Sequence, residues 1–306
     1  RFIVMTAKHA TVPQTDAPRG RTFSKKGLPY LLLLPGMAWL TIFFIVPLVS
    51  LFFTSLETLD LNSDFGEYKQ AFRFQNYVDA LTSPQTIKPL THSFVYALLA
   101  TILALLIAYP LAYAIAFRAS KAKNVLLVLV VAPFFVSFLL RTVAWRQILG
   151  DEGPVITVLQ TIGLMSPNSS IYPSAFSVVM GLVYNFLPFM TLPVYAALER
   201  LDPRLIEAAN DLYSNGFTAF RKVTWPLSLP GVVAGTLLTF IPAAGDYVNS
   251  SLLGNQNTAM IGNRIDGLFL VANDYPQAAV LSFVLMIAIL VPVLIYVRKA
   301  GTEELV

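Results

Sequence analysis

Charged residues are missing from six long stretches of the chain, and polar segments separate these stretches. The charge-free runs cover residues 27–56, 89–117, 124–140, part of 153–198 from about Ala175, 223–245 and 275–297. Each is mostly apolar and approaches or exceeds the roughly 20 residues that an α-helix needs to cross about 30 Å of hydrocarbon. Backbone groups in lipid must hydrogen-bond within their own segment, which favours helices. The pattern predicts an all-α polytopic membrane protein with six transmembrane helices.

The same pattern divides the chain into consecutive parts. They are an N-terminal arm (1–26), a first transmembrane helix (27–56), an outer excursion (57–88), a core with the other five transmembrane helices (89–298) and a tail (299–306). The first apolar run is long enough to span and lacks a cleavage-like motif, so we expect an uncleaved helix and not a signal peptide. With the N-terminus placed in the cytoplasm, 15 of the 21 Lys and Arg residues fall on the cytoplasmic side. This bias predicts that both termini are cytoplasmic.

Composition excludes several functional classes. Charged residues make up 12% of the chain, about half the usual share of a soluble domain, and mean hydropathy is +0.66. There is no cysteine to form a disulfide, a thiol nucleophile or a metal ligand, and His9 and His92 lack ligand-like spacing. No GxxxxGK[ST] phosphate loop, catalytic triad or pair of catalytic carboxylates occurs. We expect a protein that is not an enzyme, whose net charge of +4 reflects membrane topology and not nucleic-acid binding.

A polar segment, residues 200–226, lies between the fourth and fifth apolar runs. Asp202 followed by Pro203 is typical of a helix start, with an acceptor at the N-cap and proline in the first turn. Apolar residues then recur at helical spacing, at Leu205, Ala208, Ala209 and Leu212. Asn215 and Gly216 tolerate the left-handed conformation and predict the end of this helix.

A second short helix is expected from Phe217 to Thr224, with Pro226 and Pro230 closing the segment before the fifth span. The 200–226 segment is therefore predicted to be helix, turn, helix at the cytoplasmic membrane surface. From its residues alone it could bind lipid headgroups, lie passively as a loop or dock into a groove of a partner.

This segment resembles the EAA loop of ABC importer permeases. The resemblance rests on Glu207-Ala208-Ala209, on the run FRKVT at 220–224, and on Pro226-Leu227. It implies the type I importer permease fold, in which the two short helices are coupling helices seated in a cleft of a cytoplasmic ATPase. ATP and Mg²⁺ would then be bound by that partner and by no cofactor site in this chain. In one departure from the family pattern, Tyr213 stands where glycine is usual, and Gly216 follows three residues later.

The resemblance also implies roles for residues of the loop. The residues expected to contact the ATPase are Glu207, Ala208, Ala209, Gly216, Arg221 and Lys222. Glu207 is the main candidate for coupling, with a solvated helix charge as the alternative. Arg221 and Lys222 could pair with acidic groups of the ATPase or with lipid phosphates, or could reflect only the excess of positive charge on the cytoplasmic side.

Two further motifs are similar to those of spermidine/putrescine-type permeases. They are IPAAGDYVNSSLLG at 241–254 and MIGNRI at 260–265, and the long N-terminal arm resembles the first of the two permeases in such systems. The resemblance implies an importer subunit in a prokaryotic inner membrane that works with a second homologous permease, two copies of the ATPase, an extracytoplasmic substrate-binding protein and membrane lipid. Permeases for iron, amino-acid derivatives or phosphonates share parts of these motifs, and an ATP-independent secondary transporter is the less favoured alternative.

Four residues are candidates for the substrate pathway. Asp246 follows an uncharged window near the outer end of the fifth span, where an ionisable group often marks a pathway or a pair. With Tyr247 it could guide a cationic substrate, or it could be an N-cap or outer-loop carboxylate or a partner for Arg264. Tyr184 and Asn185 of the fourth span could line the passage or only pack between helices. Gly231 and Gly235 have the spacing of a close helix contact.

Overall fold

The computed structural model describes residues 28–60, 67–166, 169–213 and 215–300, and the chain divides into two compact units at Ser50. In the first unit, α1 (Leu28–Leu40) runs into a π-helical turn, η1 (Thr41–Ile45). The turn continues into α2 (Val46–Ser55), whose last residues belong to the second unit. Residues Leu32–Ser55 form one apolar stretch of 24 residues, long enough to cross a membrane. This stretch matches the predicted first span.

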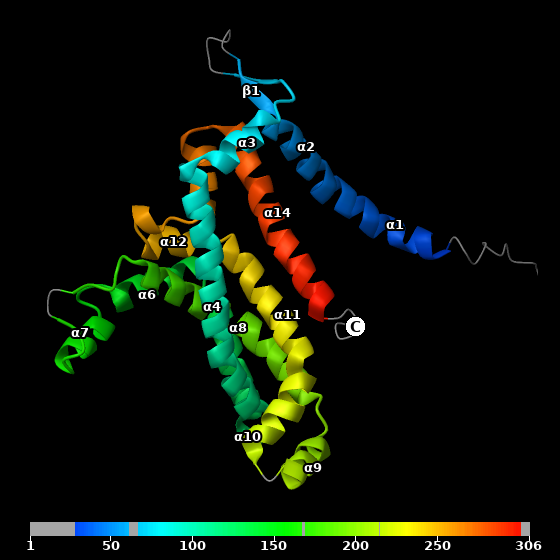
Figure 1. Ribbon diagram of the computed structural model, residues 1–306, viewed down its shortest axis with the longest axis vertical. Helices are drawn as coiled ribbons and strands as arrows, with labels where there is room; N and C mark the ends of the chain where they lie inside the picture. The colour runs from blue at the N-terminus through cyan, green and yellow to red at the C-terminus, as the bar shows by residue number, and fades with distance from the viewer. Residues whose placement is uncertain (1–27, 61–66, 167–168, 214, 301–306) are drawn as a thin grey trace, which may run out of the picture. The chain divides into compact units, whose positions relative to one another are not determined.

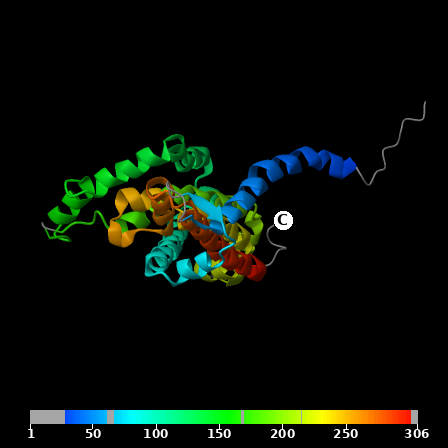
Figure 2. The ribbon, with the colours of Figure 1, turned by 90° about the horizontal axis from the view of Figure 1, so that it is seen from above.

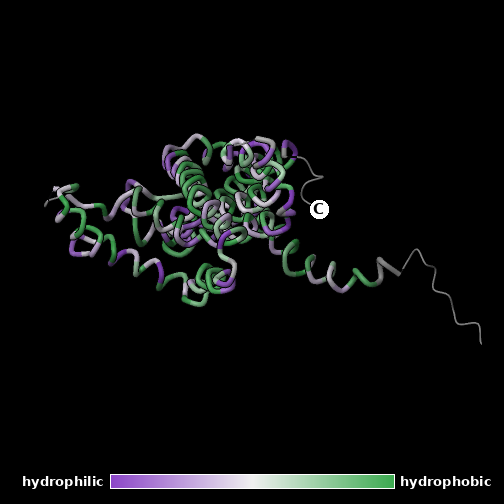
Figure 3. The backbone as a smooth tube through the Cα atoms, turned by 90° about the horizontal axis from the view of Figure 1, so that it is seen from below, coloured by the Kyte–Doolittle hydropathy of each residue, from purple (hydrophilic) through white to green (hydrophobic). Residues whose placement is uncertain are grey.

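Three long helices form the centre of the second unit. They are α4 (Pro84–Phe117), α8 (Ala175–Glu199) and α11 (Trp225–Ala244), and α14 (Tyr275–Ala300) packs beside α11 (Figure 1). Among the described residues, five helices are long and apolar enough to span, or six if one strongly bent pair counts as a single span. The helical membrane fold is therefore confirmed. Figure 3 shows that hydrophobic residues occupy much of the length of the helices.

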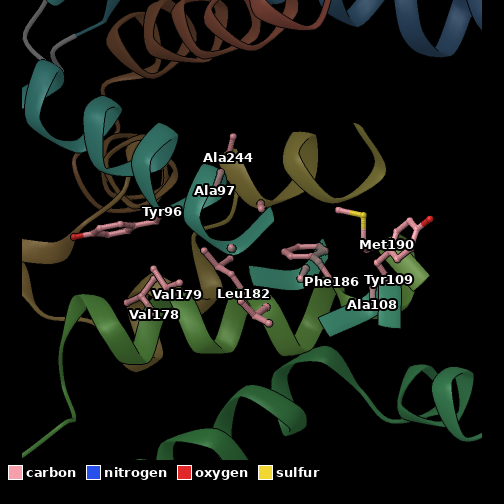
Figure 4. Packing of buried hydrophobic residues seen from close by; sticks show 14 of the residues in the cluster. Tyr96, Ala97, Ala108, Tyr109, Val178, Val179, Leu182, Phe186, Met190 and Ala244 are labelled. Carbon is pink, nitrogen blue, oxygen red and sulfur yellow. The ribbon is translucent and has the colours of Figure 1, made fainter. Parts of the chain in front are cut away.

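Small side chains allow α4 to pack closely against α8. Ala97, Ala100, Ala104 and Ala108 of α4 recur at intervals of three and four residues and are fully buried. This spacing puts them on one face of the helix. Larger side chains of α8, among them Val178, Leu182 and Phe186, face that surface in the core cluster (Figure 4). The core thus consists of bulky side chains from one helix packed against an alanine face of the other.

The third span is not the straight helix that the charge-free run 124–140 predicts. Helix α5 (Lys123–Val131) ends in a 3₁₀ turn, η3 (Ala132–Phe135), and α6 (Phe138–Leu149) then leaves at a bend of 97°. Pro133 cannot donate a backbone hydrogen bond, and Val136 and Ser137 are extended, which breaks the helix. From the bend, α6 and α7 (Pro154–Thr161) extend to one side of the central helices (Figures 1 and 2).

Shorter elements lie toward one end of the central helices. Strands β1 (Glu57–Leu59) and β2 (Tyr68–Gln70) pair antiparallel, with Glu57 opposite Gln70. The expected short helix in the 57–88 excursion is α3 (Gln75–Thr82). Four short elements connect α11 to α14: α12 (Val248–Leu253), η5 (Gln256–Thr258), α13 (Ile261–Asp266) and the π-helical turn η6 (Gly267–Val271). At the opposite end lie η2 (Ser120–Ala122), α9 (Pro203–Tyr213), α10 (Gly216–Ala219) and the π-helical turn η4 (Phe220–Thr224).

Candidate functional site

The first helix of the 200–226 segment begins where the sequence predicts. Asp202 Oδ1 accepts the backbone N–H of Arg204 at 2.9 Å, which satisfies one of the free donors at the start of α9. Along α9, Ala209 is buried, whereas Glu207 and Ala208 are exposed. The helix therefore has a packed face and a free face, and the Glu207 carboxylate lies on the free one.

The turn between the two short helices differs from the prediction. Asn215 has a φ of −137° and its Oδ1 accepts the N–H of Phe217 at 2.9 Å, so it begins α10. Gly216 is the first residue of that helix. The prediction that Asn215 and Gly216 adopt the left-handed conformation was wrong, because the asparagine side chain caps the following helix. The residue between the two helices, Ser214, lies outside the described residues.

The second short helix is continuous with the fifth span, and the predicted break at Pro226 and Pro230 is absent from the described chain. Residues Gly216–Ala244 form one helical stretch of 29 residues. Pro226 lies in the first turn of α11, directly after the π-helical turn η4. That wider turn accommodates the proline, which has no N–H to donate. The first span has the same arrangement, in which the π-helical turn η1 lies just before Pro47. Helices α10 and α11 are therefore joined by helical backbone and not by a loop.

An aromatic cluster fastens the start of α11 to α4. The ring of Tyr109 lies 5.6 Å from that of Phe220 and 5.2 Å from that of Trp225, measured between centroids. Its hydroxyl is hydrogen-bonded to that of Ser228 at 2.7 Å, and both residues are buried. Sequence reasoning missed this cluster, although Tyr109, Tyr113 and Phe117 recur every four residues on α4.

Charged side chains gather near this end of the molecule. Arg221 and Lys222 are exposed on η4, as Glu207 is on α9. Close by in the fold, Lys123 at the start of α5 pairs with Glu199 at the end of α8. This end of the molecule thus carries exposed charges of both signs beside exposed apolar side chains such as Leu205 and Phe217.

At the other end of α11, Asp246 is buried and hydrogen-bonded. Only 8% of the residue is exposed. Its Oδ1 accepts the backbone N–H of Asn249 at 2.7 Å, and its Oδ2 accepts from Nδ2 of the same residue at 3.2 Å. Burial raises the pKa of Asp246 to about 6, against the opposing effect of these hydrogen bonds. Asp246 therefore caps the short helix α12.

Asn249 links Asp246 to the fourth span. Asn185 of α8 donates through Nδ2 to Asn249 Oδ1 at 3.0 Å, and Thr142 of α6 donates to the same oxygen at 3.3 Å. Asn185 Nδ2 also reaches Thr142 Oγ1 at 3.2 Å. Thr142 and Asn249 are fully buried and Asn185 is 1% exposed. The structure thus brings two of the four predicted pathway residues into one network through Asn249 and Thr142, which sequence reasoning missed.

The other two pathway candidates lie apart from this network. The ring centroids of Tyr184 and Trp145 are 5.4 Å apart, which places Tyr184 in the contact between α8 and α6. Tyr247 is 46% exposed and lines an open cleft of about 300 Å³ together with Asp266 and Phe269. Adjacent residues of the GDYV motif therefore differ sharply, since Asp246 is buried in protein and Tyr247 is open.

The bent third span also buries a guanidinium group. Arg141 is 8% exposed and lies over the rings of Phe134 and Phe138, 5.4 and 5.6 Å from their centroids. Its Nε and Nη1 atoms find no hydrogen-bond partner among the described residues. The two rings offset part of the cost of burying this charge.

Comparison with known proteins identifies the family. Residues 105–300 match the family described as "Binding-protein-dependent transport system inner membrane component". The chain is 36% identical to the spermidine/putrescine transport system permease protein PotB of Haemophilus influenzae over 261 residues, covering 85% of this chain and 90% of that protein. It is 34% identical to PotB of Escherichia coli over 264 residues, covering 86% and 94%.

The fold has a counterpart among solved structures. A bacterial ABC transporter involved in the import of the acidic polysaccharide alginate contains a chain that matches with a TM-score of 0.66 at 19% identity, covering 90% of this chain and 96% of the other. This likeness concerns the fold, which is that of an ABC importer permease. Together with the family match and the membrane-spanning helices, it shows that the chain is a multi-pass inner-membrane protein and belongs to the binding-protein-dependent transport system inner membrane components.

Proposed function

We propose that the chain is one of two permease subunits of an ATP-driven importer for the polyamines spermidine and putrescine, and that it forms half of the translocation pathway. The observation that carries the proposal is the 34–36% identity to permeases of spermidine/putrescine systems over about 85% of the chain. In this assembly a second, similar permease completes the pathway. Two copies of a cytoplasmic ATPase bind ATP and Mg²⁺, and an extracytoplasmic binding protein delivers the substrate.

The geometry of the 200–226 segment supports coupling to the ATPase. Glu207, Arg221 and Lys222 are exposed at one end of the helices, where a partner can reach them. Behind them, α10 continues into α11 without a break, and the Tyr109 cluster ties this junction to α4. Movement of a docked ATPase is therefore transmitted to two membrane-spanning helices at once. In the proposed topology this end and both termini are cytoplasmic, which the bias of Lys and Arg supports.

The cleft beside Tyr247 has the chemistry that attracts an alkylammonium ion. It combines the carboxylate of Asp266 with the rings of Tyr247 and Phe269. Carboxylates pair with ammonium groups, and aromatic faces attract cations. Within the ranges that the structure describes, no lysine or arginine pairs with Asp266. In the proposed topology the cleft lies at the outer end of α11, where a polyamine enters.

Uptake by the reconstituted complex tests the function. The full chain is purified with its partner subunits, placed in proteoliposomes and supplied with binding protein, ATP and radiolabelled spermidine or putrescine. We expect uptake that requires ATP and that excess unlabelled polyamine abolishes. Uptake of iron, an amino-acid derivative or a phosphonate in place of polyamines would assign the chain to a related importer. Polyamine uptake without ATP would contradict an ATP-driven mechanism.

A further inference from the structure

We infer that Asn249 is a positioning residue for transport, which fastens α12 to α6 and α8, and that Asp246 acts through Asn249 without contacting the substrate. Asn249 uses its side-chain oxygen and nitrogen in opposite directions, toward Thr142 and Asn185 on one side and toward Asp246 on the other. The role in transport rests on the proposed function. The fastening of α12 to α6 and α8 rests only on contacts within the chain.

Asp246 determines which way the amide of Asn249 points. An ionised carboxylate only accepts hydrogen bonds, so the amide nitrogen must face Asp246. The amide oxygen is then turned toward Asn185 Nδ2, which lies 3.0 Å away, and toward the Thr142 hydroxyl. If the amide were reversed, the NH₂ group of Asn249 would face the NH₂ group of Asn185, and Asn185 would have to turn its own amide so that its Oδ1, which has no partner among the described residues, could accept instead. The charge of Asp246 therefore selects the orientation that holds α6 and α8.

The backbone around the network is shaped for this contact. Gly181 lies on α8 opposite Asn249, and a Cβ atom there would come within 2.7 Å of Asn249 Oδ1 and within 2.4 Å of Leu253 Cδ1. A larger residue at this position would force the side chains of Asn249 and Leu253 to shift. At the other end of α12, Ser177 Oγ donates to the carbonyl oxygen of Leu253 at 2.7 Å. Helix α12 is thus held against α8 at both ends.

The position of α12 gives the network a role in transport. Helix α12 follows α11 after only three residues, and α11 is continuous with α10 in the 200–226 segment. Asn249 therefore lies just beyond the far end of the helix whose near end is proposed to meet the ATPase. Through Thr142 it reaches α6, the part of the third span beyond the 97° bend. A shift of α11 is in this way passed on to α6.

An exchange of the two side chains separates this role from substrate attraction. In Asp246→Asn, the oxygen of the new amide can cap α12, but its NH₂ group then faces the NH₂ group of Asn249. In Asn249→Asp, two carboxylates face each other. The double variant Asp246→Asn/Asn249→Asp restores every donor–acceptor pair and conserves the net charge. The carboxylate then stands at position 249, where it accepts from Thr142 and Asn185.

We expect each single variant to lower the rate of polyamine uptake by about ten-fold, the factor in rate that corresponds to about 1.4 kcal/mol. This is the scale of one buried hydrogen bond. The double variant should recover to within about three-fold of the parent protein, on the same scale. If Asp246 instead attracts the substrate directly, the double variant stays as impaired as Asp246→Asn, and that result overturns the inference.

A second measurement needs no substrate, so that failure of the inference is distinct from failure of the proposed function. The sequence has no cysteine, which lets the pair Trp145→Cys/Tyr184→Cys report the contact between α6 and α8 through a short thiol cross-linker. Cross-linking should slow several-fold in the single variants and recover in the double variant, again on the scale of one hydrogen bond. The control pair Lys123→Cys/Glu199→Cys, at the other end of α5 and α8, should not change. Equal cross-linking in all four proteins would refute the positioning role even if polyamine uptake is confirmed.

Discussion

Alanine at Gly231 should force α8 and α11 apart. A Cβ atom built on Gly231 would lie 2.4 Å from Ala197 Cβ and 2.6 Å from the carbonyl oxygen of Pro193. Ordinary carbon contacts are about 3.5–4.0 Å, so the helices must separate by roughly 1 Å at this point. Neither obstacle can rotate away, because one is the Cβ of an alanine and the other belongs to the backbone. The contact confirms the close helix packing predicted from Gly231 and Gly235.

The size of the effect follows from the opposing terms. Overpacking a well-packed core costs about 1–3 kcal/mol, and the rigid obstacles place Gly231→Ala at the upper end. Alanine is favoured over glycine within a helix by about 0.5–1 kcal/mol, which offsets part of that cost. The expected net destabilisation is about 2 kcal/mol. Gly235→Ala should cost less, since its nearest obstacles, the Met190 sulfur at 2.9 Å and the Met190 carbonyl oxygen at 3.0 Å, are farther away and the sulfur can move.

Gly216→Ala is the matched control on the same continuous helix. No described atom lies within 4 Å of a Cβ at Gly216, so this variant should be neutral or slightly stabilised. Thermal inactivation of the detergent-solubilised complex, followed by loss of monodisperse protein at a fixed heating rate, ranks the three variants. We expect Gly231→Ala to inactivate at the lowest temperature, Gly235→Ala next and Gly216→Ala last. Equal temperatures for Gly231→Ala and Gly216→Ala would show that the helices do not meet at this glycine.

Three further changes test the two ends of the molecule. Glu207→Lys reverses the exposed charge on α9 and should leave ATP hydrolysis while abolishing uptake. The control Asp211→Lys, also exposed on that helix, should retain uptake, and normal uptake by Glu207→Lys would disprove the coupling role. Tyr109→Phe removes the hydroxyl bonded to Ser228 of α11 and should lower stability by about 1 kcal/mol. An unchanged inactivation temperature would count against this hydrogen bond as a fastening between α4 and α11. Asp266→Asn should raise the polyamine concentration for half-maximal uptake several-fold, whereas Asp79→Asn, at the same end but outside the cleft, should not. Equal behaviour of the two variants would argue against attraction of the polyamine by the cleft beside Tyr247.

Local chemistry explains which features could be predicted from the sequence. The start of α9 was predictable because Asp202 and Pro203 act on the backbone next to them. The turn at Asn215 was not, because asparagine can either end one helix or cap the next, and the choice depends on where its side chain finds a donor. The bend in the third span was hidden for a different reason. A charge-free run records the absence of charge, and Pro133 breaks the helix without interrupting the hydrophobic pattern.

Beyond the local cap that Asp246 forms on Asn249, the network around Asn249 had no local signal. Asn249 is 107 residues from Thr142 and 64 from Asn185 along the chain, so only the packing of three helices brings their side chains together. The sequence pattern could single out Asp246 as an unusual charge near the end of a span. It could not distinguish a carboxylate that faces a pathway from one that orients a neighbouring amide.

The continuity of α10 with α11 determines how the two ends can work together. A loop that ended at Pro226, as the sequence predicts, could move with the ATPase while the span stayed in place. Because α10 and α11 form one helical stretch of 29 residues, we expect a displacement of the exposed end to reach Asp246 and α12, with the π-helical turn η4, Pro230 and Pro242 as the points where the helix can bend. Because Asn249 joins α12 to both α6 and α8, that displacement reaches the third and fourth spans through side chains that have little freedom to adjust. Under the proposed function, this connection would let ATP-driven movement on one side of the membrane alter the pathway on the other.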